Sequence, residues 1–163
     1  MTAQLIVPGI TDVNTLVCLS RARKYTQYCR MVKDALASIC PFCNIDRKYN
    51  KVIREDEYWM AWPCQPPEKN TKLHFLIVPK RHVKGLLELT VEEWSDLRLM
   101  IGHLQIDHQI NSDGILIRDG DATLSAGTIQ HLHIHMMVPD GTGRVESPFY
   151  KGKESEDEGV ARA

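Results

Sequence analysis

Residues 130–139 read "QHLHIHMMVP", with three histidines at strict alternation inside an apolar run. Successive side chains of a β-strand point to opposite faces of the sheet, so this pattern predicts a strand with two unlike faces. Three imidazoles share one face and three apolar side chains share the other: His131, His133 and His135 against Leu132, Ile134 and Met136. We expect one face to pack into the core and the other to carry chemistry.

The three histidines are too far apart along a strand to bind one metal ion together. At about 3.3 Å per residue, His131 and His135 lie roughly 13 Å apart. Zinc binds an imidazole nitrogen at about 2.0–2.1 Å, so at most two neighbouring histidines reach one ion. The histidines must therefore divide their functions.

Three histidines on one strand face, behind a glycine-containing loop, favour nucleophilic chemistry on a phosphate. A neutral imidazole attacks phosphorus without first losing a proton, and its pKa of about 6.5 keeps it mostly neutral at pH 7. His133 is best placed to attack, and His135 can donate to a phosphate oxygen or to the leaving atom. The loop before them offers backbone amides and the hydroxyl groups of Ser125 and Thr128 to the same oxyanion.

Around this strand the chain alternates short extended segments with helical ones. The helix from Thr90 is marked by a capping box of Thr90 and Glu93. Its expected apolar face comprises Trp94, Leu97, Ile101 and Leu104. Strands are expected at residues 51–53, 58–62, 73–79, 115–119 and 131–138.

Residues 12–39 predict one or two amphipathic helices, with apolar positions at Leu19, Ala22, Cys29, Val32, Leu36 and Ile39.

The 163 residues suit a single domain with a sizeable core. A net charge of −1 argues against a protein that binds nucleic acids in general. The chain shows neither a membrane-spanning run nor a secretory signal, so we expect a cytoplasmic protein without a membrane partner. The polar residues 151–163 predict a disordered tail.

The sequence "CPFC" pairs Cys40 with Cys43. In a reducing compartment this spacing indicates either metal binding or redox chemistry. Two thiolates can bind one tetrahedral zinc if two more ligands are found, and His82 and His131 are the candidates. The alternative is a thiol-disulfide oxidoreductase, although the expected setting of such a motif, a strand before it and a helix after it, is missing.

The motif "HLHIHMM" fits the pattern His-φ-His-φ-His-φ-φ at every position and resembles the histidine triad (HIT) family. The upstream order "LHFLIVPKRH", helix, "ILIRDG", glycine-containing loop and triad is also similar, over residues 40–139. The resemblance implies an α+β fold with a five-stranded antiparallel sheet and flanking helices, usually in a homodimer. It divides the chain into an N-terminal helical extension (1–39), a HIT domain (40–148) and a flexible polar tail (149–163).

The resemblance also implies a nucleotide hydrolase or nucleotidyltransferase. His133 matches the nucleophile that takes up the nucleotidyl group, and His135 matches the histidine that contacts the scissile phosphate. Thr128 matches the hydroxyl residue before the triad, and His74 matches a histidine that supports the site from a neighbouring strand.

Some members of the family bind a structural zinc, which implies the ligand set Cys40, Cys43, His82 and His131.

Three departures from the family pattern bear on the substrate. Ala126-Gly127-Thr128 stands where many members have Gly-Gln-Ser/Thr, so a glutamine side chain is missing. Arg118 replaces a common amide residue, and its guanidinium would favour a more highly charged substrate. Cys64 falls near the place of an acidic residue that often holds the ribose hydroxyls.

The primary hypothesis is therefore a two-step enzyme that acts on the α-phosphate of a phosphoramidate, a dinucleoside polyphosphate or a nucleotide sugar. Its intermediate is a nucleotidyl-histidine. The alternatives are a nucleotide- or zinc-binding interaction module with little turnover, and the oxidoreductase.

Overall fold

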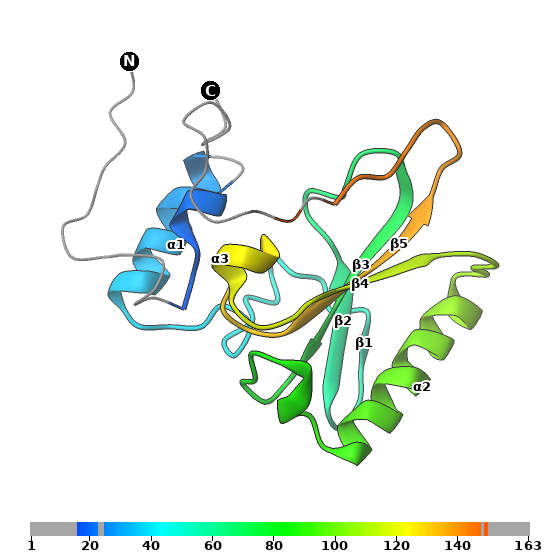
Figure 1. Cartoon of the computed structure of the whole chain (residues 1–163), viewed down its shortest axis with the longest axis horizontal. Coiled ribbons are helices and arrows are strands. Elements are labelled where there is room, and N and C mark those ends of the chain that lie inside the picture. The colour runs from blue at the N-terminus through cyan, green and yellow to red at the C-terminus, as the bar shows by residue number, and fades with distance from the viewer. Residues whose placement is uncertain (1–15, 23–24, 148, 150–163) are drawn as a thin grey trace.

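The computed structural model describes residues 16–22, 25–147 and 149, and it is an α+β fold with one five-stranded sheet (Figure 1). The elements in chain order are η1 (Leu19–Arg21), α1 (Tyr25–Leu36), β1 (Arg54–Glu55), β2 (Trp59–Pro63), β3 (Thr71–Pro79), η2 (Leu86–Glu88), α2 (Val91–Asp107), β4 (Gly114–Arg118), α3 (Ala122–Ser125) and β5 (His133–Pro139). The predicted fold class is confirmed. Residues 1–15 and 150–163 lie outside the described residues. They include the start of the predicted N-terminal extension and most of the predicted tail.

The sheet is antiparallel throughout, in the order β1-β2-β3-β5-β4. The histidine strand β5 therefore lies between β3 and β4, and its backbone is paired on both sides. The register places His135 opposite Leu76 on β3 and opposite Leu116 on β4. β5 begins at His133 rather than at residue 131, so His131 precedes the strand.

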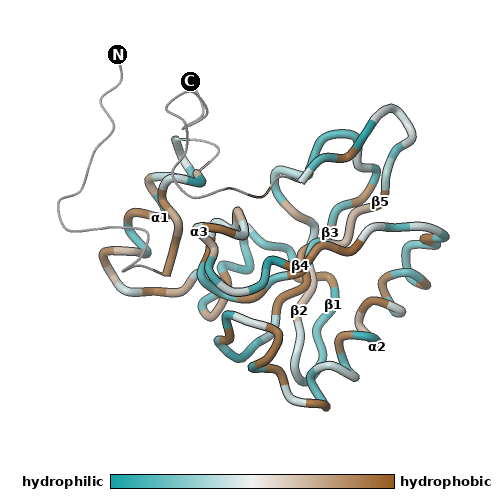
Figure 2. Tube along the Cα trace, in the orientation of Figure 1, coloured by the Kyte–Doolittle hydropathy of each residue, from teal (hydrophilic) through white to brown (hydrophobic). Residues whose placement is uncertain are grey.

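The predicted division of the strand into two faces is confirmed. Leu132, Ile134 and Met136 are fully buried in the main core cluster. Helix α2 covers this face and contributes Leu97, Met100 and Leu104 to the same cluster. Figure 2 shows mostly apolar residues where β3, β4 and β5 cross. A second cluster, on the histidine face, contains Cys40, Phe42, Met60, Trp62 and Val78.

Helix α2 begins as predicted, with both hydrogen bonds of the Thr90–Glu93 capping box present. The Glu93 carboxylate is also buried and accepts two hydrogen bonds from Arg81, at 2.9 and 2.8 Å. These bonds hold the pKa of Glu93 below its usual value. The carboxylate therefore connects the start of α2 to the segment that follows β3.

The predicted apolar face of α2 is wrong at one position. Trp94 is 44% exposed, whereas Met100 is completely buried. The buried stripe of the helix is rotated because the buried carboxylate of Glu93 takes the first inward position. Within the described residues, no helix combines the length and apolar character needed to cross a bilayer.

Two further predictions needed correction. The strand expected at residues 51–53 lies at Arg54–Glu55 instead, because Val52 donates its backbone N–H to Asn50 in a turn. The helix expected within residues 12–39 is α1, but its buried residue is Met31, and the predicted core position Leu36 is 64% exposed.

Candidate functional site

A cavity of about 400 Å³ opens on the histidine face of the sheet. Its walls come from α1, the loop 41–50, the end of β2 with residues 64–66, and the turn before β5. Four residues predicted for the site line it: His133, His135, Thr128 and Arg118. Its volume is within the usual range for a small-molecule site.

The contacts of His133 assign its protons. Its Nδ1 lies 2.7 Å from the carbonyl oxygen of His131. A carbonyl only accepts, so Nδ1 carries the proton, and a neutral ring then has its lone pair on Nε2. Burial lowers the pKa of His133 to about 4, which keeps the ring neutral at pH 7. The neutral ring of His133 therefore has an Nε2 lone pair, which is the chemical requirement for attack without a separate base.

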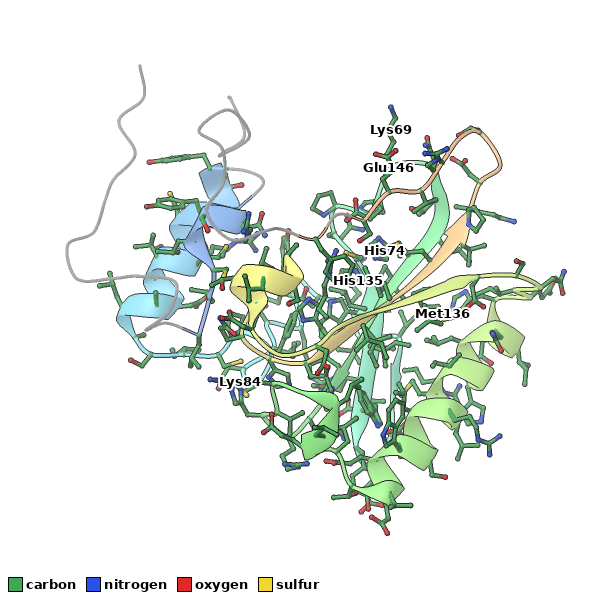
Figure 3. The ribbon with its side chains drawn as sticks, viewed as in Figure 1. Lys69, His74, Lys84, His135, Met136 and Glu146 are labelled. Atoms are coloured by element: carbon green, nitrogen blue, oxygen red, sulfur yellow. The ribbon has the colours of Figure 1, made fainter. Side chains whose placement is uncertain are left out.

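A relay of hydrogen bonds assigns the protons of His135 in the same way. The backbone N–H of Glu68 donates to His74 Nδ1 at 2.9 Å, so the proton of a neutral His74 is on Nε2. That Nε2 lies 2.8 Å from His135 Nδ1, between adjacent strands (Figure 3). His135 Nδ1 therefore accepts, and its Nε2–H is the remaining donor. His74 is buried and does not line the cavity, so it orients His135.

The turn before β5 packs tightly against the triad. A Cβ atom built on Gly127 would lie 3.1 Å from Cε1 of His133 and 3.2 Å from Cβ of Ala122. A larger residue here would require the ring of His133 or Ala122 to shift by a few tenths of an ångström. Sequence reasoning did not select Gly127, although its place in the glycine-containing loop was a usable signal.

The structure separates the two hydroxyl residues of this turn. Thr128 lines the cavity, whereas Ser125 is the buried last residue of α3 and does not. The structure thus does not bring the Ser125 hydroxyl to the site. Its carbonyl oxygen instead accepts a hydrogen bond from Arg118.

Arg118 is buried beside the triad and has several protein contacts. Its Nη1 donates to the Ser125 carbonyl, and its Nη2 donates to Ser147 Oγ at 2.6 Å. Its guanidinium carbon lies 4.9 Å from the ring centre of Phe149. Arg118 thus links the edge strand β4 to the α3 turn and to the segment after β5, while its side chain still reaches the cavity wall.

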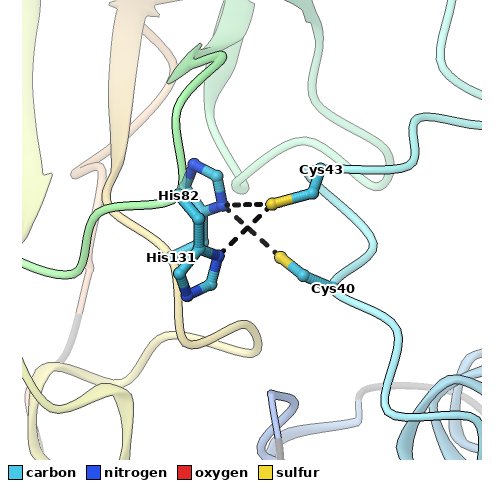
Figure 4. A group of neighbouring side chains, drawn as sticks. All are labelled: Cys40, Cys43, His82 and His131. Atoms are coloured by element: carbon cyan, nitrogen blue, oxygen red, sulfur yellow. Dashed lines mark hydrogen bonds between the residues drawn. The ribbon is translucent and has the colours of Figure 1, made fainter.

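The four predicted metal ligands converge on one point (Figure 4). Cys40 Sγ lies 3.4 Å from His131 Nδ1, and Cys43 Sγ lies 3.3 Å from His82 Nδ1 and 3.6 Å from His131 Nδ1. Around a tetrahedral zinc, sulfur and nitrogen ligands lie about 3.6 Å apart, from bonds of about 2.3 and 2.1 Å. The spacing of the donor atoms therefore fits a tetrahedral ion.

The protonation of this cluster also fits a metal. His131 Nε2 lies 3.0 Å from the Pro79 carbonyl oxygen, which leaves the Nδ1 lone pair facing the thiols. Burial lowers the pKa of His82, and it lowers the pKa of His131 to about 4, so both imidazoles are neutral. Burial and then the neighbouring Cys40 raise the pKa of the Cys43 thiol to about 11. A divalent cation would reverse this rise, because it stabilises two adjacent thiolates.

Two residues outside the predicted catalytic, substrate-binding and metal-binding sets lie next to the triad. Phe42, between the two cysteines, packs edge-on against His133 with ring centres 5.5 Å apart. Cys64 lines the cavity, and its Sγ lies within 4.8 Å of ring nitrogens of His74 and His135. Cys64 is thus next to the triad, as expected for the residue that replaces an acidic side chain.

Comparison with known proteins gives sequence relatives of two kinds. The chain is 25% identical to adenosine 5'-monophosphoramidase HINT3 of Danio rerio over 116 residues, which cover 66% of this chain and 69% of that protein. It is 35% identical to bis(5'-adenosyl)-triphosphatase of Dictyostelium discoideum over 66 residues, or 39% of this chain. That match spans less than half, 44%, of the length of the triphosphatase.

Solved structures share the fold. A Hit-like protein matches with a TM-score of 0.54 and 21% identity, over 63% of this chain and all of its own. A histidine triad nucleotide-binding protein from Candida albicans matches with a TM-score of 0.57 and 16% identity, over 72% of this chain and 86% of its own. The HIT domain model itself matches residues 46–142, more than half of the chain. With the histidine triad at the edge of a cavity on this fold, the chain belongs to the HIT-domain family.

Proposed function

We propose that this protein is a nucleotide hydrolase or nucleotidyltransferase in which His133 attacks the α-phosphorus of the substrate. One observation carries the proposal: the contacts of the two cavity histidines leave a lone pair on Nε2 of His133 and an N–H on Nε2 of His135. A nucleophile and a donor thus lie side by side, as phosphoryl transfer requires. Both curated relatives are named for the hydrolysis of adenosine phosphate derivatives, which supports a nucleotide substrate.

In the first step, the Nε2 lone pair of His133 forms a bond to phosphorus, and the bond from phosphorus to the leaving group breaks in line with it. The leaving group departs with that electron pair, and the Nε2–H of His135 donates to the leaving atom or to a phosphoryl oxygen. The ring of His133 becomes a cationic nucleotidyl-imidazolium. The carbonyl of His131, which accepts the Nδ1–H, stabilises the positive charge.

In the second step, water attacks phosphorus from the vacated side. The bond from phosphorus to Nε2 breaks, and its electron pair returns to Nε2 as the lone pair. The water proton passes to solvent, the Nε2–H of His135 again donates to a phosphoryl oxygen, and a nucleoside monophosphate is released. In a transferase, another acceptor would replace the water.

We propose that Cys40, Cys43, His82 and His131 hold a structural zinc ion, which would close the loop 40–43 onto the strand that carries the triad. The distances and the neutral imidazoles of the cluster support this. His131 contributes a ring nitrogen to the cluster and its carbonyl to His133, so a metal there would stabilise the orientation of the nucleophile. Convergence of the two thiols with two imidazoles favours metal binding over the oxidoreductase hypothesis.

We also propose a homodimer. β4 is an edge strand of the sheet and has one partner, β5, within the described residues. Its Ile115 is 41% exposed, and α2 exposes Trp94, Leu99 and Ile106. An open strand edge together with exposed apolar side chains is typical of a surface that pairs with a second copy.

A cytoplasmic location remains a prediction.

The first prediction tests the nucleophile. The substitution His133→Ala should abolish turnover, because no other described side chain offers a lone pair at this position. Intact-mass analysis after mixing wild-type protein with diadenosine triphosphate or adenosine phosphoramidate should show a nucleotidyl adduct that the variant lacks. His103→Ala, at an exposed position of α2, is the matched control and should retain the adduct. Wild-type turnover by His133→Ala would refute the covalent mechanism, and binding without any adduct would favour the interaction module.

The second prediction tests the metal. Protein purified without chelators should contain about one zinc per chain, and Cys43→Ser should lose it. Because the ion binds the native state only, the melting temperature should fall in this variant and on chelation. Cys29→Ser, a cysteine on α1 outside the cluster, should keep both the zinc and the melting temperature. Metal-free protein with two titratable thiols at Cys40 and Cys43 would contradict the site.

The third prediction tests assembly. Sedimentation velocity at micromolar concentration should show a homodimer, and Ile115→Lys should shift it toward monomer because a charge would be placed on the pairing edge. Leu36→Lys, a similar change at an exposed position of α1, should leave the dimer intact. A monomeric wild-type protein would exclude this assembly.

A further inference from the structure

The N-terminal segment lies outside the residues that match the HIT domain, yet it forms part of the cavity. The match begins at residue 46, whereas α1 spans Tyr25–Leu36. Six of its side chains line the cavity together with His133 and His135: Thr26, Gln27, Arg30, Met31, Lys33 and Asp34. Figure 1 shows α1 near α3 and away from α2. This helix is thus an added wall of the site.

Backbone hydrogen bonds attach the segment to the turn before the triad. Val17 and Ile129 form an antiparallel bridge, flanked by a bond from Cys18 N–H to the Thr128 carbonyl at 2.8 Å. On the other side, the Gln130 N–H donates to the Leu16 carbonyl at 2.9 Å. Arg21 Nη2 also donates to the Thr123 carbonyl at 3.1 Å. Residues 16–21 are therefore fixed to the backbone around Thr128.

Buried side chains fix α1 in the same place. Val17, Ala22 and Met31 are buried and form one apolar cluster, against which Ile129 packs. Met31 also lines the cavity, so the inward face of α1 continues from this cluster into the site. Arg30, next to Met31, and Gln27 and Asp34, one turn from it, are thereby held at the cavity wall.

Arg30 has the geometry of an anion-binding group. Its guanidinium carbon lies 4.0 Å from the ring centre of Tyr49, which holds the planar group by its face. Stacking leaves the N–H donors at the edge of the guanidinium available, and none of them donates to a residue in the described part of the chain. A guanidinium held in this way matches phosphate oxygens in a bidentate manner.

The cavity is also lined by Asp34, Asp46 and Arg118, and neither Arg30 nor Lys33 forms an ion pair with these two carboxylates. Arg118 donates to Ser125 and Ser147, whereas Lys33 forms no ion pair with a described residue. Asp34 lies one turn from Arg30, and the Arg30 charge lowers its pKa, but burial has the larger, opposite effect and raises it. No ion pair joins the Arg30 and Asp34 side chains.

We propose that α1 completes the substrate site, and that Arg30 and Lys33 bind an anionic leaving group on the far side of the bond that His133 attacks. The favoured substrates are then nucleotides whose departing group carries further phosphates, such as dinucleoside polyphosphates, rather than phosphoramidates with a neutral amine. This rests on the proposed function of His133. A neutral amine gives these two cations nothing to pair with, whereas a polyphosphate pairs with both.

The test compares two substrates in three variants of the full chain: Arg30→Gln, Arg30→Lys and Lys33→Gln. For diadenosine triphosphate relative to adenosine phosphoramidate, Arg30→Gln should raise the KM ratio by about tenfold or more, the effect of a lost charged hydrogen bond. Lys33→Gln should raise it in the same direction, and Arg30→Lys should recover part of the loss. Arg98→Gln, on α2 at the opposite face of the sheet, is the control and should not change the ratio. Equal effects on both substrates, or no effect, would overturn the proposal.

Binding separates this proposal from the proposed mechanism. Calorimetry of diadenosine triphosphate with His133→Ala, and with His133→Ala combined with Arg30→Gln, measures the role of Arg30 without turnover. About tenfold weaker binding in the double variant would support the role of Arg30. The absence of an adduct in the wild-type protein would refute only the covalent mechanism and would leave this result unaffected. Equal affinities would overturn the role of Arg30, whatever the adduct shows.

Discussion

The hydrogen bond from His133 Nδ1 to the carbonyl of His131 connects the separate parts of this site. It fixes the tautomer of the ring that faces the cavity. The residue that supplies the carbonyl also points its own Nδ1 at the two thiols and its Nε2 at the Pro79 carbonyl. Any movement of His131 would therefore move both the thiol–imidazole cluster and the ring of His133. The spacing of two residues makes this coupling possible, because the carbonyl of His131, just before β5, lies within reach of the ring of His133 at the start of the strand.

The central position of β5 supplies the second constraint. Backbone pairing on both sides leaves the strand little freedom. The relay from Glu68, before β3, runs through His74 to His135 along a diagonal between β3 and β5, because His74 is paired with Met137 and His135 with Leu76. The opposite face is fully buried under α2, so the histidines cannot turn inward. The strand is therefore held by apolar packing on one face, while hydrogen bonds set the protons on the other.

The N-terminal segment shows how a site can be enlarged outside its family domain. One β-bridge and one small apolar cluster fix α1 beside the turn that carries Thr128. The helix thereby contributes polar side chains to a cavity whose histidines are more than ninety residues away in the sequence. A cation on such a helix alters the charge of the cavity without any change in the strands that hold the triad.

From the sequence alone, local periodicity predicted the two-faced strand and the α2 helix with its capping box, because both patterns are visible in a short window. The α+β class and the grouping of Cys40 and Cys43 with His82 and His131 followed from the resemblance to the HIT family over residues 40–139. Only the tertiary structure decided that Ser125 is buried away from the cavity, that Trp94 is exposed, and that α1 lines the site. These features depend on how distant segments pack. The inward carboxylate of Glu93, bound to Arg81, rotates the buried stripe of α2. The pairing of Val17 with Ile129 brings α1 to the triad. Each contact joins segments that are distant in the sequence, and local periodicity carries no information about such contacts.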